Sequence, residues 1–277
     1  MPRLRKSRMA ASLVALLIAG HSLAQTPAHE KTSQEFIPTV GQSGKDVIWV
    51  PTPQPLVDKM LDMAKLTPQD KLVDLGSGDG RTVITAAKRG AIARGIEFNP
   101  NMVALSRSAA RREGVSDRAT FEQADIFESD FSDATVVTLF LLPGLNLRLM
   151  PTLLNMKPGT RVVSNSFTMG DWEPDETAEA EGCTSYCTAY KWTVPAKVEG
   201  RWNTPDGELM LTQKFQYVEG TFNNSKDGTT QTITDGRLNG PQLQFKAGDR
   251  EYTARVDGDR MQGSANGQSG WTAKRSG

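Results

Sequence analysis

The segment from Val73 to Arg81, with the sequence VDLGSGDGR, constrains the fold more than any other part of this 277-residue chain. Apolar residues lead into three glycines at alternate positions, Gly76, Gly78 and Gly80, and a helical pattern follows. Glycines at such a turn let a ligand approach the backbone closely, and the amides of the next helix face that ligand. The segment therefore predicts a strand, a ligand-binding turn and a helix. The plainer interpretation is a glycine-rich turn that binds nothing.

Strands and helices are expected to alternate around this turn. The expected strands are 71–75, 94–98, 120–124, 135–142 and 161–167, and the expected helices are 55–66, 82–88, 99–112 and 145–156. Asn99 and Pro100 supply an N-cap and a first-turn proline for the third helix. Residues 135–142 are almost continuously apolar, as buried parallel strands are. The alternation predicts an α/β domain with a mostly parallel, Rossmann-like sheet.

Three acids follow successive strands of this pattern. Asp74, Glu97 and Asp125 would all lie at the carboxyl edge of the sheet, where open parallel sheets bind ligands. Taken singly, each acid could be an ordinary surface residue. A dinucleotide fingerprint would require glycine or alanine at position 81, and Arg81 stands there instead. The segment resembles the Asp-x-Gly-x-Gly-x-Gly pattern of class I methyltransferases.

The resemblance extends over residues 49–175, which are similar to the protein-lysine methyltransferases that modify the c-ring protein of ATP synthase and the adenine nucleotide translocator of mitochondria. The matching pieces are Val50-Pro51-Thr52, the segment from Asp74 to Arg81, Asn99-Pro100 with Ser106-Arg107, Arg112-Glu113-Gly114-Val115, and Trp172 with Pro174-Asp175. Trp49 departs from the family, which usually has tyrosine there. The rest of the chain lies outside the resemblance.

The resemblance implies S-adenosylmethionine as methyl donor and a class I fold. It assigns the methionine part to Asp74, Gly76 and Gly78, the ribose to Glu97 and the adenine to Asp125. Thr52 would lie over the methionyl end, although it could also be the N-cap of the helix after Pro53. The implied set is completed by Ser77, Asn99 and Ile126. Asp79 and Arg81 lie close in sequence, but neither can be assigned as a catalytic base, and no catalytic residue is predicted.

The acceptor implied by the resemblance is a protein lysine side chain. Leu141-Leu142-Pro143-Gly144 follows the fourth strand, where enzymes that methylate adenine or cytosine amino groups carry Asn/Asp-Pro-Pro-Tyr, so such bases are disfavoured. Those leucines could equally be core residues. A small-molecule acceptor and an exported, non-catalytic module that binds S-adenosylmethionine remain alternatives. A dehydrogenase is disfavoured by Arg81 and by the absence of a Tyr-x-x-x-Lys arrangement in the α/β part.

Residues 1–24 are expected to be a Sec-type signal peptide. Four basic residues precede an apolar run at 9–20, and Ser22 and Ala24 fit cleavage after Ala24. The run is shorter than the roughly 20 residues that a membrane-spanning helix needs, so no stable membrane insertion is expected after cleavage. The mature protein would be periplasmic or secreted. Residues 25–44 are expected to be a disordered lead-in, and 45–197 the methyltransferase domain.

Residues 198–277 differ from the rest of the chain in composition and in hydrophobic pattern. They hold 12 of the 25 glycines, and short alternating runs are separated by Asp-Gly and Asn-Gly turns. Such turns are hairpin signals, so we expect a separate antiparallel meander or small barrel of six to eight strands.

Charge and cysteine content limit the partners. Without residues 1–24, 28 basic residues remain against 32 acidic ones, which is a poor surface for nucleic acid. The expected partner is therefore a protein or small-molecule methyl acceptor, and the sequence leaves the oligomeric state open. Cys183 and Cys187 could bridge if the turn between them allows it. Two cysteines without a nearby histidine cannot complete a zinc site, so no metal is expected.

Overall fold

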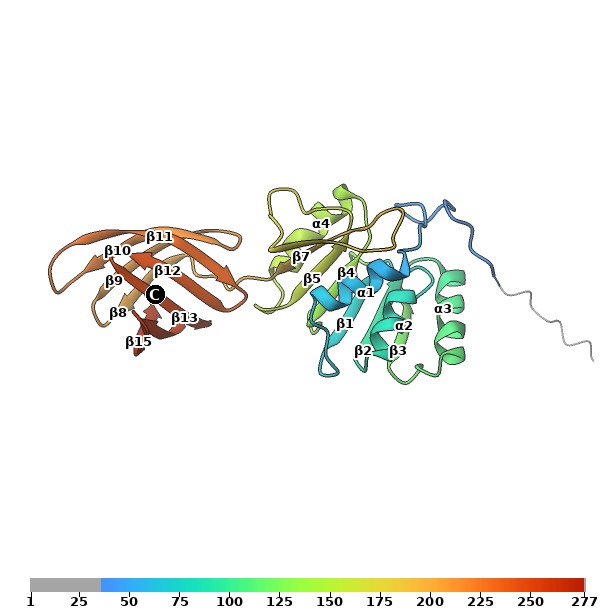
Figure 1. The fold of residues 1–277 in the computed structure, drawn as a ribbon, viewed down its shortest axis with the longest axis horizontal. Coiled ribbons are helices and arrows are strands. Elements are labelled where there is room, and N and C mark those ends of the chain that lie inside the picture. The colour runs from blue at the N-terminus through green and yellow to red at the C-terminus, as the bar shows by residue number, and fades with distance from the viewer. Residues whose placement is uncertain (1–35, 277) are drawn as a thin grey trace, which may run out of the picture. The chain divides into compact units, whose positions relative to one another are not determined.

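The computed structural model describes residues 36–276. Its first sheet has seven strands in the order β3-β2-β1-β4-β5-β7-β6 (Figure 1). These strands are β1 (Lys71–Leu75), β2 (Ile92–Glu97), β3 (Ala119–Gln123), β4 (Val136–Leu139), β5 (Arg161–Asn165), β6 (Glu176–Glu179) and β7 (Thr188–Thr193). β1 to β5 pair in parallel, and β7 pairs antiparallel with both β5 and β6. The expected mostly parallel, Rossmann-like sheet is confirmed.

Helices cover both faces of this sheet. They are α1 (Gln54–Met63), α2 (Arg81–Lys88), α3 (Pro100–Arg112) and α4 (Pro143–Leu154). Buried residues of α1, α2 and α3 share one core cluster with Leu72, Val136 and Val163. Leu149 and Leu153 of α4 belong to a second cluster with residues of the opposite face. Because neighbouring strand residues point to opposite faces, the near-continuous apolar strands of the sequence serve both clusters.

The start of α3 follows the expected capping. The Asn99 side chain accepts hydrogen bonds from the backbone N–H groups of Asn101 at 2.9 Å and Met102 at 3.5 Å, and Pro100 occupies the first turn. The cap satisfies amides that have no partner within the helix.

The hairpin of β6 and β7 was not expected from the sequence. β6 is a mostly exposed run of Glu-Thr-Ala-Glu, which carries no apolar alternation. A disulfide between Cys183 and Cys187 closes the loop between the two strands. In β7, the Trp192 indole is fully buried and donates to the Trp172 carbonyl at 2.7 Å. Tertiary packing of these two tryptophans therefore secures a hairpin that local sequence does not indicate.

The second sheet is a closed antiparallel barrel of eight strands, which confirms the expected β domain. Its strands are β8 (Gly200–Thr204), β9 (Gly207–Lys214), β10 (Tyr217–Asn224), β11 (Thr230–Asn239), β12 (Gln242–Ala247), β13 (Arg250–Asp257), β14 (Arg260–Ala265) and β15 (Gln268–Arg275). β15 pairs with β8 and closes the barrel. The interior is filled by one apolar cluster that includes Trp202, Phe222, Phe245, Tyr252 and Trp271. It is a packed core.

A short hairpin precedes α1. Gly41 N donates to Trp49 O and Trp49 N donates to Gln42 O, both at 2.9 Å, and Ser43 bridges to Ile48. We call residues 41–49 the N-terminal hairpin. Its first part belongs to the segment for which the sequence suggested a disordered lead-in, so the structure differs from that expectation between residues 41 and 44. The expected signal peptide lies outside the described residues. Within residues 36–276, each helix is too short or too polar to span a bilayer.

Candidate functional site

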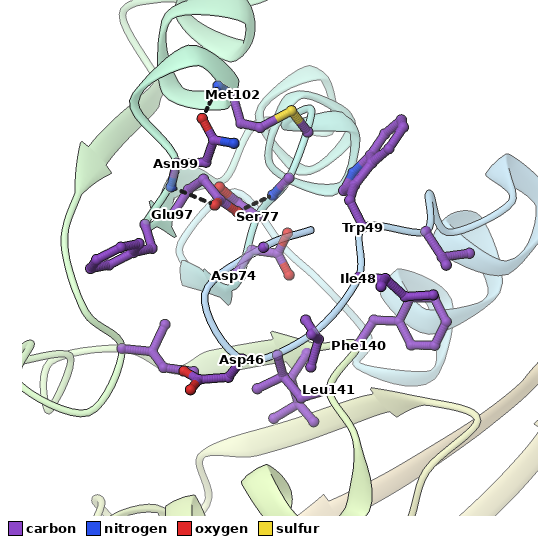
Figure 2. A pocket seen from close by; sticks show the side chains of 18 of the residues that line it. Asp46, Ile48, Trp49, Asp74, Ser77, Glu97, Asn99, Met102, Phe140 and Leu141 are labelled. Atoms are coloured by element: carbon purple, nitrogen blue, oxygen red, sulfur yellow. Dashed lines mark hydrogen bonds between the residues drawn. The ribbon is translucent and has the colours of Figure 1, made fainter. Parts of the chain in front are cut away.

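A pocket lies at the carboxyl ends of the parallel strands, under the N-terminal hairpin (Figure 2). All nine residues that the sequence assigned to the cofactor line this one pocket. They are Thr52, Asp74, Gly76, Ser77, Gly78, Glu97, Asn99, Asp125 and Ile126. The parallel sheet gathers them because β1, β2 and β3 all end at the same edge.

The glycine loop between β1 and α2 has a fixed shape. Gly76, Gly78 and Gly80 have φ angles of 77°, 54° and 81°, in the left-handed region that favours glycine. A Cβ on Gly78 would lie 2.7 Å from Trp49 Nε1, and one on Gly80 would lie 2.7 Å from the Phe121 ring. The chain's own packing therefore requires glycine at 78 and 80, beyond any need of a ligand.

Glu97 links this loop to the start of α3. Its Oε2 accepts from Gly78 N at 2.9 Å, and its Oε1 accepts from Asn99 N at 2.8 Å (Figure 2). An ionised carboxylate offers about four lone-pair positions, so each oxygen can accept a second hydrogen bond. The carboxylate is thus held rigidly with acceptor capacity left for a pair of hydroxyls.

Asp74 is a buried acid in the wall of the pocket. Its side chain accepts a hydrogen bond from Thr138 Oγ1 at 2.7 Å. The pKa of Asp74 is raised to about 7, mainly by burial and also by the charges of Asp79 and Glu97, against the Thr138 hydrogen bond, which lowers it. A positively charged ligand would lower the pKa of Asp74 again, because it stabilises the ionised carboxylate.

Asp125 is paired with Lys45 of the N-terminal hairpin. The Lys45 hydrogen bond lowers the pKa of Asp125, and the N–H of Phe127, 3.0 Å from Asp125 Oδ1, lowers it further. The same contact with Asp125 raises the pKa of Lys45. The Lys45 ammonium also lies 5.0 Å from the centre of the Phe98 ring. Lys45 was not predicted from the sequence, because a lysine in a polar, glycine-containing segment resembles an ordinary solvated residue.

Thr52 does not cap α1. The N-cap is Pro53, which makes no side-chain cap, so the capping interpretation of Thr52 is wrong. Thr52 Oγ1 instead accepts from Asn165 Nδ2 at 3.2 Å, and its carbonyl accepts from Arg81 Nη1 at 3.0 Å. Arg81 also pairs with Asp79 at 2.6 Å. Arg81 therefore connects the glycine loop with the segment before α1.

The side chains of Ser77 and Asn99, two of the predicted cofactor residues, make contacts within the protein. A Cβ on Gly95 would lie 2.5 Å from Ser77 Oγ, so the Ser77 hydroxyl is packed against β2. The Asn99 side-chain oxygen caps α3. These residues are therefore available to a ligand mainly through their backbone.

Leu141 and Leu142, which follow β4, differ in burial. Leu141 is buried in the core cluster beneath α4, whereas Leu142 is 48% exposed, and both line the pocket. Phe140, Phe167 and Tyr186 also line it, and none of these three was predicted from the sequence.

These residues fit S-adenosylmethionine. The ligand carries a sulfonium and an ammonium group, which suit the buried Asp74 carboxylate, and a ribose whose two hydroxyls suit the remaining lone pairs of Glu97. Gly76 provides close approach to the backbone, since a Cβ there would meet only Leu141, at 3.3 Å. We propose that the nine pocket residues hold the cofactor in this arrangement.

Comparison with known proteins agrees with the site. The family model described as the ANTKMT methyltransferase domain matches residues 74–176. A protein-lysine N-methyltransferase of Saccharolobus islandicus is 40% identical over 151 residues, which are 53% of this chain and 94% of that protein. A lysine N-methyltransferase of Mus musculus that is named for the c-ring protein of ATP synthase is 34% identical over 209 residues, which are 75% of this chain and 77% of that protein.

A solved structure shares the fold of the methyltransferase domain. The crystal structure of an RNA methyltransferase from Salinibacter ruber, in complex with S-adenosyl-L-homocysteine, is 50% identical with a TM-score of 0.51 and covers 54% of this chain and 96% of that one. S-Adenosylmethionine is accordingly the methyl donor. The chain belongs to the family of S-adenosylmethionine-dependent methyltransferases that includes these lysine N-methyltransferases.

Proposed function

We propose that the protein transfers a methyl group from S-adenosylmethionine to a lysine side chain of a protein. The observation that carries this proposal is the match to the archaeal protein-lysine N-methyltransferase, because 94% of that relative aligns with about half of this chain. The aligned length of 151 residues is close to that of the domain that holds the pocket.

The apolar part of the pocket suits a lysine acceptor. S-Adenosylmethionine supplies a methyl group bound to a positively charged sulfur. The acceptor amine must be neutral to attack that carbon, so its proton has to leave first. Asp74 and Glu97 are assigned to the donor, while the apolar wall of Leu141 and Ile48 favours the neutral form of the acceptor amine. The chain's main contributions would be alignment and exclusion of water, and alignment alone can lower a barrier by several kcal/mol.

An RNA acceptor is less well supported, although the Salinibacter protein is described as an RNA methyltransferase. The chain beyond residue 24 has more acidic than basic residues, which opposes binding of a phosphate backbone. The segment from Leu141 to Gly144 also offers no Asn/Asp-Pro-Pro-Tyr group for an exocyclic amine.

A labelling experiment tests the proposal. The protein from Gln25 onward is incubated with methyl-tritiated S-adenosylmethionine and bacterial envelope protein, and the product is hydrolysed to amino acids. We expect tritium in methyllysine. Envelope protein whose amines have been blocked by acetylation is the matched control, because an amide nitrogen does not accept a methyl group, and it should take up no label.

The other outcomes identify the alternatives. Label only in low-mass compounds would support a small-molecule acceptor and contradict the lysine proposal. Binding of the donor with no transfer to either fraction would support a non-catalytic binding module. RNA from the same cells, labelled in parallel, tests the nucleic-acid alternative.

We also propose that the protein is exported. The expectation rests on residues 1–24, and the disulfide between Cys183 and Cys187 supports it, because such bonds persist in oxidising compartments. Expression of the full chain in a Gram-negative host, followed by fractionation and N-terminal sequencing, tests this. A periplasmic protein that begins at Gln25 is the expected result, and a cytoplasmic protein with an intact N-terminus would contradict it.

A further inference from the structure

Three aromatic rings form a cluster in the wall of the pocket. The ring centres of Phe140 and Tyr186 are 5.2 Å apart, those of Phe140 and Phe167 are 6.1 Å apart, and those of Phe167 and Tyr186 are 6.4 Å apart. Phe140 follows β4 and Phe167 follows β5, so both lie at the carboxyl edge of the sheet. We call these three residues the aromatic triad.

The triad and the cofactor residues occupy different sides of one pocket. The predicted cofactor residues lie mostly at or just after the ends of β1, β2 and β3, whereas the triad lies just after β4 and β5 and in the loop between β6 and β7. Tyr186 is 44% exposed, so this side opens to solvent. An acceptor that enters here would meet the triad before it reaches the donor.

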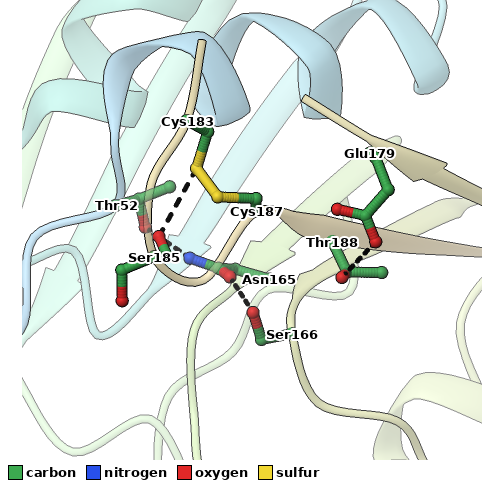
Figure 3. The surroundings of a disulfide bond; sticks show 8 residues. All are labelled: Thr52, Asn165, Ser166, Glu179, Cys183, Ser185, Cys187 and Thr188. Carbon is green, nitrogen blue, oxygen red and sulfur yellow. Dashed lines mark hydrogen bonds between the residues drawn. A yellow bond between two sulfur atoms is a disulfide. The ribbon is translucent and has the colours of Figure 1, made fainter. Parts of the chain in front are cut away.

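Tyr186 is placed by the disulfide loop. Tyr186 lies between Cys183 and Cys187 in the sequence. Cys183, shown with its disulfide in Figure 3, packs against the core cluster that includes residues of α1. Tyr186 has a φ angle of 54°, which is uncommon for a bulky residue. Nearby Ser166, on the segment after β5, also has a positive φ of 58°, and its N–H donates to Thr188 O at 2.8 Å. Such conformations persist where the surrounding structure fixes them, and they concentrate at functional sites.

The chemistry of the triad selects a cation on an alkyl chain. The face of an aromatic ring attracts a positive charge within about 6 Å of its centre. The three centres lie within 6.4 Å of one another, and the T-shaped contact between Phe140 and Tyr186 covers a face of one of these rings, so a cation has to bind to the faces that the contacts leave open. The rings also offer apolar surface to the methylene groups of a lysine.

We propose that the aromatic triad is the acceptor-binding entrance for a lysine side chain, and that the Cys183–Cys187 disulfide holds Tyr186 in it. This inference rests on the proposed lysine acceptor for its biological ligand. The triad contacts the acceptor, and the disulfide acts through Tyr186 as a positioning element.

A pair of matched ligands tests the cation site without any need for turnover. Protein saturated with S-adenosylhomocysteine is titrated with Nα-acetyl-Nε-trimethyl-lysine methylamide, and separately with its neutral isostere in which carbon replaces the quaternary nitrogen. Ligand-observed NMR measures both affinities. We expect the cation to bind about fivefold more tightly than the isostere.

Variants separate the triad from the acidic side chains, which also favour cations. Tyr186→Phe should keep the preference for the cation, whereas Tyr186→Leu, which keeps bulk and removes the ring, should lose most of it. Tyr217→Leu, at a tyrosine of similar exposure on the barrel, is the matched control and should behave like the wild type. Equal affinities of wild type and Tyr186→Leu for the cation would overturn the proposal.

Reduction tests the role of the disulfide. Dithiothreitol converts the bond to two thiols and is itself oxidised to a cyclic disulfide. We expect reduced protein, and the variant with Cys183→Ser and Cys187→Ser, to bind the cation as weakly as Tyr186→Leu while binding S-adenosylhomocysteine unchanged. The chain has no other cysteines, so the double variant should not respond to dithiothreitol. Unchanged cation binding after reduction would contradict the positioning role.

The two proposals fail in different ways. Methylated lysine together with wild-type behaviour of Tyr186→Leu would reject the triad and keep the proposed function. The reverse result, a triad-dependent preference for the cation without any lysine methylation, would reject the proposed function and keep the cation site. In steady-state kinetics on a lysine acceptor, Tyr186→Leu should raise KM for the acceptor and leave KM for the donor unchanged.

Discussion

Thr138 on β4 donates a hydrogen bond of 2.7 Å to Asp74 on β1, its direct neighbour in the parallel register. Thr138 is fully buried and Asp74 is 7% exposed. One hydroxyl thus partners a carboxyl group that has two other acids, Asp79 and Glu97, acting on it. Ionisation of Asp74 is therefore unfavourable in the folded protein. The size of this free energy cost depends on pH and on the charge of the bound ligand.

Asp74→Asn should stabilise the protein at alkaline pH. The folded-state pKa of Asp74 is raised to about 7, above its ordinary value, so the folded state holds a proton that the unfolded chain releases. Wild-type stability attributable to Asp74 therefore falls as pH rises from about 4 to about 7 and stays low above that range. The variant should gain up to about 4 kcal/mol in free energy of unfolding at pH 8 and nothing at pH 4. Urea unfolding at both values measures this.

The same variant should bind S-adenosylhomocysteine at least about tenfold more weakly at pH 7.5, because it has lost the charge that faces the ligand. Asp249→Asn, at an exposed acid between β12 and β13, is the matched control for both measurements. A stability gain that is equal at pH 4 and pH 8 would show that the charge of Asp74 is not its cause.

Asp70→Asn should show the opposite pH dependence. Burial alone would raise the pKa of Asp70, but hydrogen bonds from Arg161, Thr135 and Thr67 outweigh it and lower the pKa. Its stabilising contribution is therefore present above the unfolded pKa, near 4, and is lost as pH falls through the lowered value. The variant should lose about 2 kcal/mol at pH 7, and this loss should shrink as pH falls below the unfolded pKa.

Asp70 precedes β1, at the opposite end of that strand from the pocket. Affinity for S-adenosylhomocysteine should therefore be unchanged in Asp70→Asn under conditions where the variant is folded. A large loss of affinity would mean that the two ends of the strand are coupled.

Glu97→Gln should weaken cofactor binding and loosen the glycine loop. The amide has one acceptor oxygen, so either Gly78 N–H or Asn99 N–H would face an NH₂ group instead of an acceptor. We expect about a tenfold loss of affinity for S-adenosylhomocysteine by calorimetry and a fall in Tm of about 2–4 °C. Glu122→Gln, on the neighbouring strand β3 and exposed, should change neither quantity.

Lys45→Ala should raise cofactor affinity about threefold, because Lys45 competes with the adenine amino group for Asp125. The difference should shrink in high salt, since the pair is partly exposed and salt screens it. Lys71→Ala removes a more exposed pair with Asp133 at the other end of β1 and serves as the control. A loss of affinity in Lys45→Ala would instead show that the N-terminal hairpin helps to hold the ligand.

The parts of the site that sequence could predict are those that the α/β repeat places by itself. Each parallel strand must end at the same edge, so Asp74, Glu97 and Asp125 had to converge once the strands were located. The barrel was equally accessible, because Asp-Gly and Asn-Gly turns between alternating runs leave few other folds. Strand periodicity and turn residues are properties of short stretches of sequence, so they can be predicted without knowledge of tertiary contacts.

The positions of Tyr186 and Lys45 in the pocket depend on tertiary structure. Tyr186 reaches the pocket because a disulfide and a hairpin of β6 and β7 carry it there, and neither has a periodic signal. Lys45 reaches Asp125 through a hairpin whose polar residues resemble those of a linker. The two cysteines around Tyr186 were visible in the sequence, but the contacts of Tyr186 with Phe140 and of Lys45 with Asp125 join residues far apart in the chain, and local patterns do not record them.

The closed barrel has a consequence for how such a chain can arise. Its first and last strands, β8 and β15, are hydrogen-bonded neighbours, so the two strands that begin and end the domain lie side by side. A self-contained module with adjoining ends can be joined to another protein, or removed from it, without re-pairing a single strand. The archaeal relative, 94% of which is accounted for by 151 aligned residues, has no room for such a module. The barrel is therefore a part that a relative can lack while it keeps the methyltransferase domain.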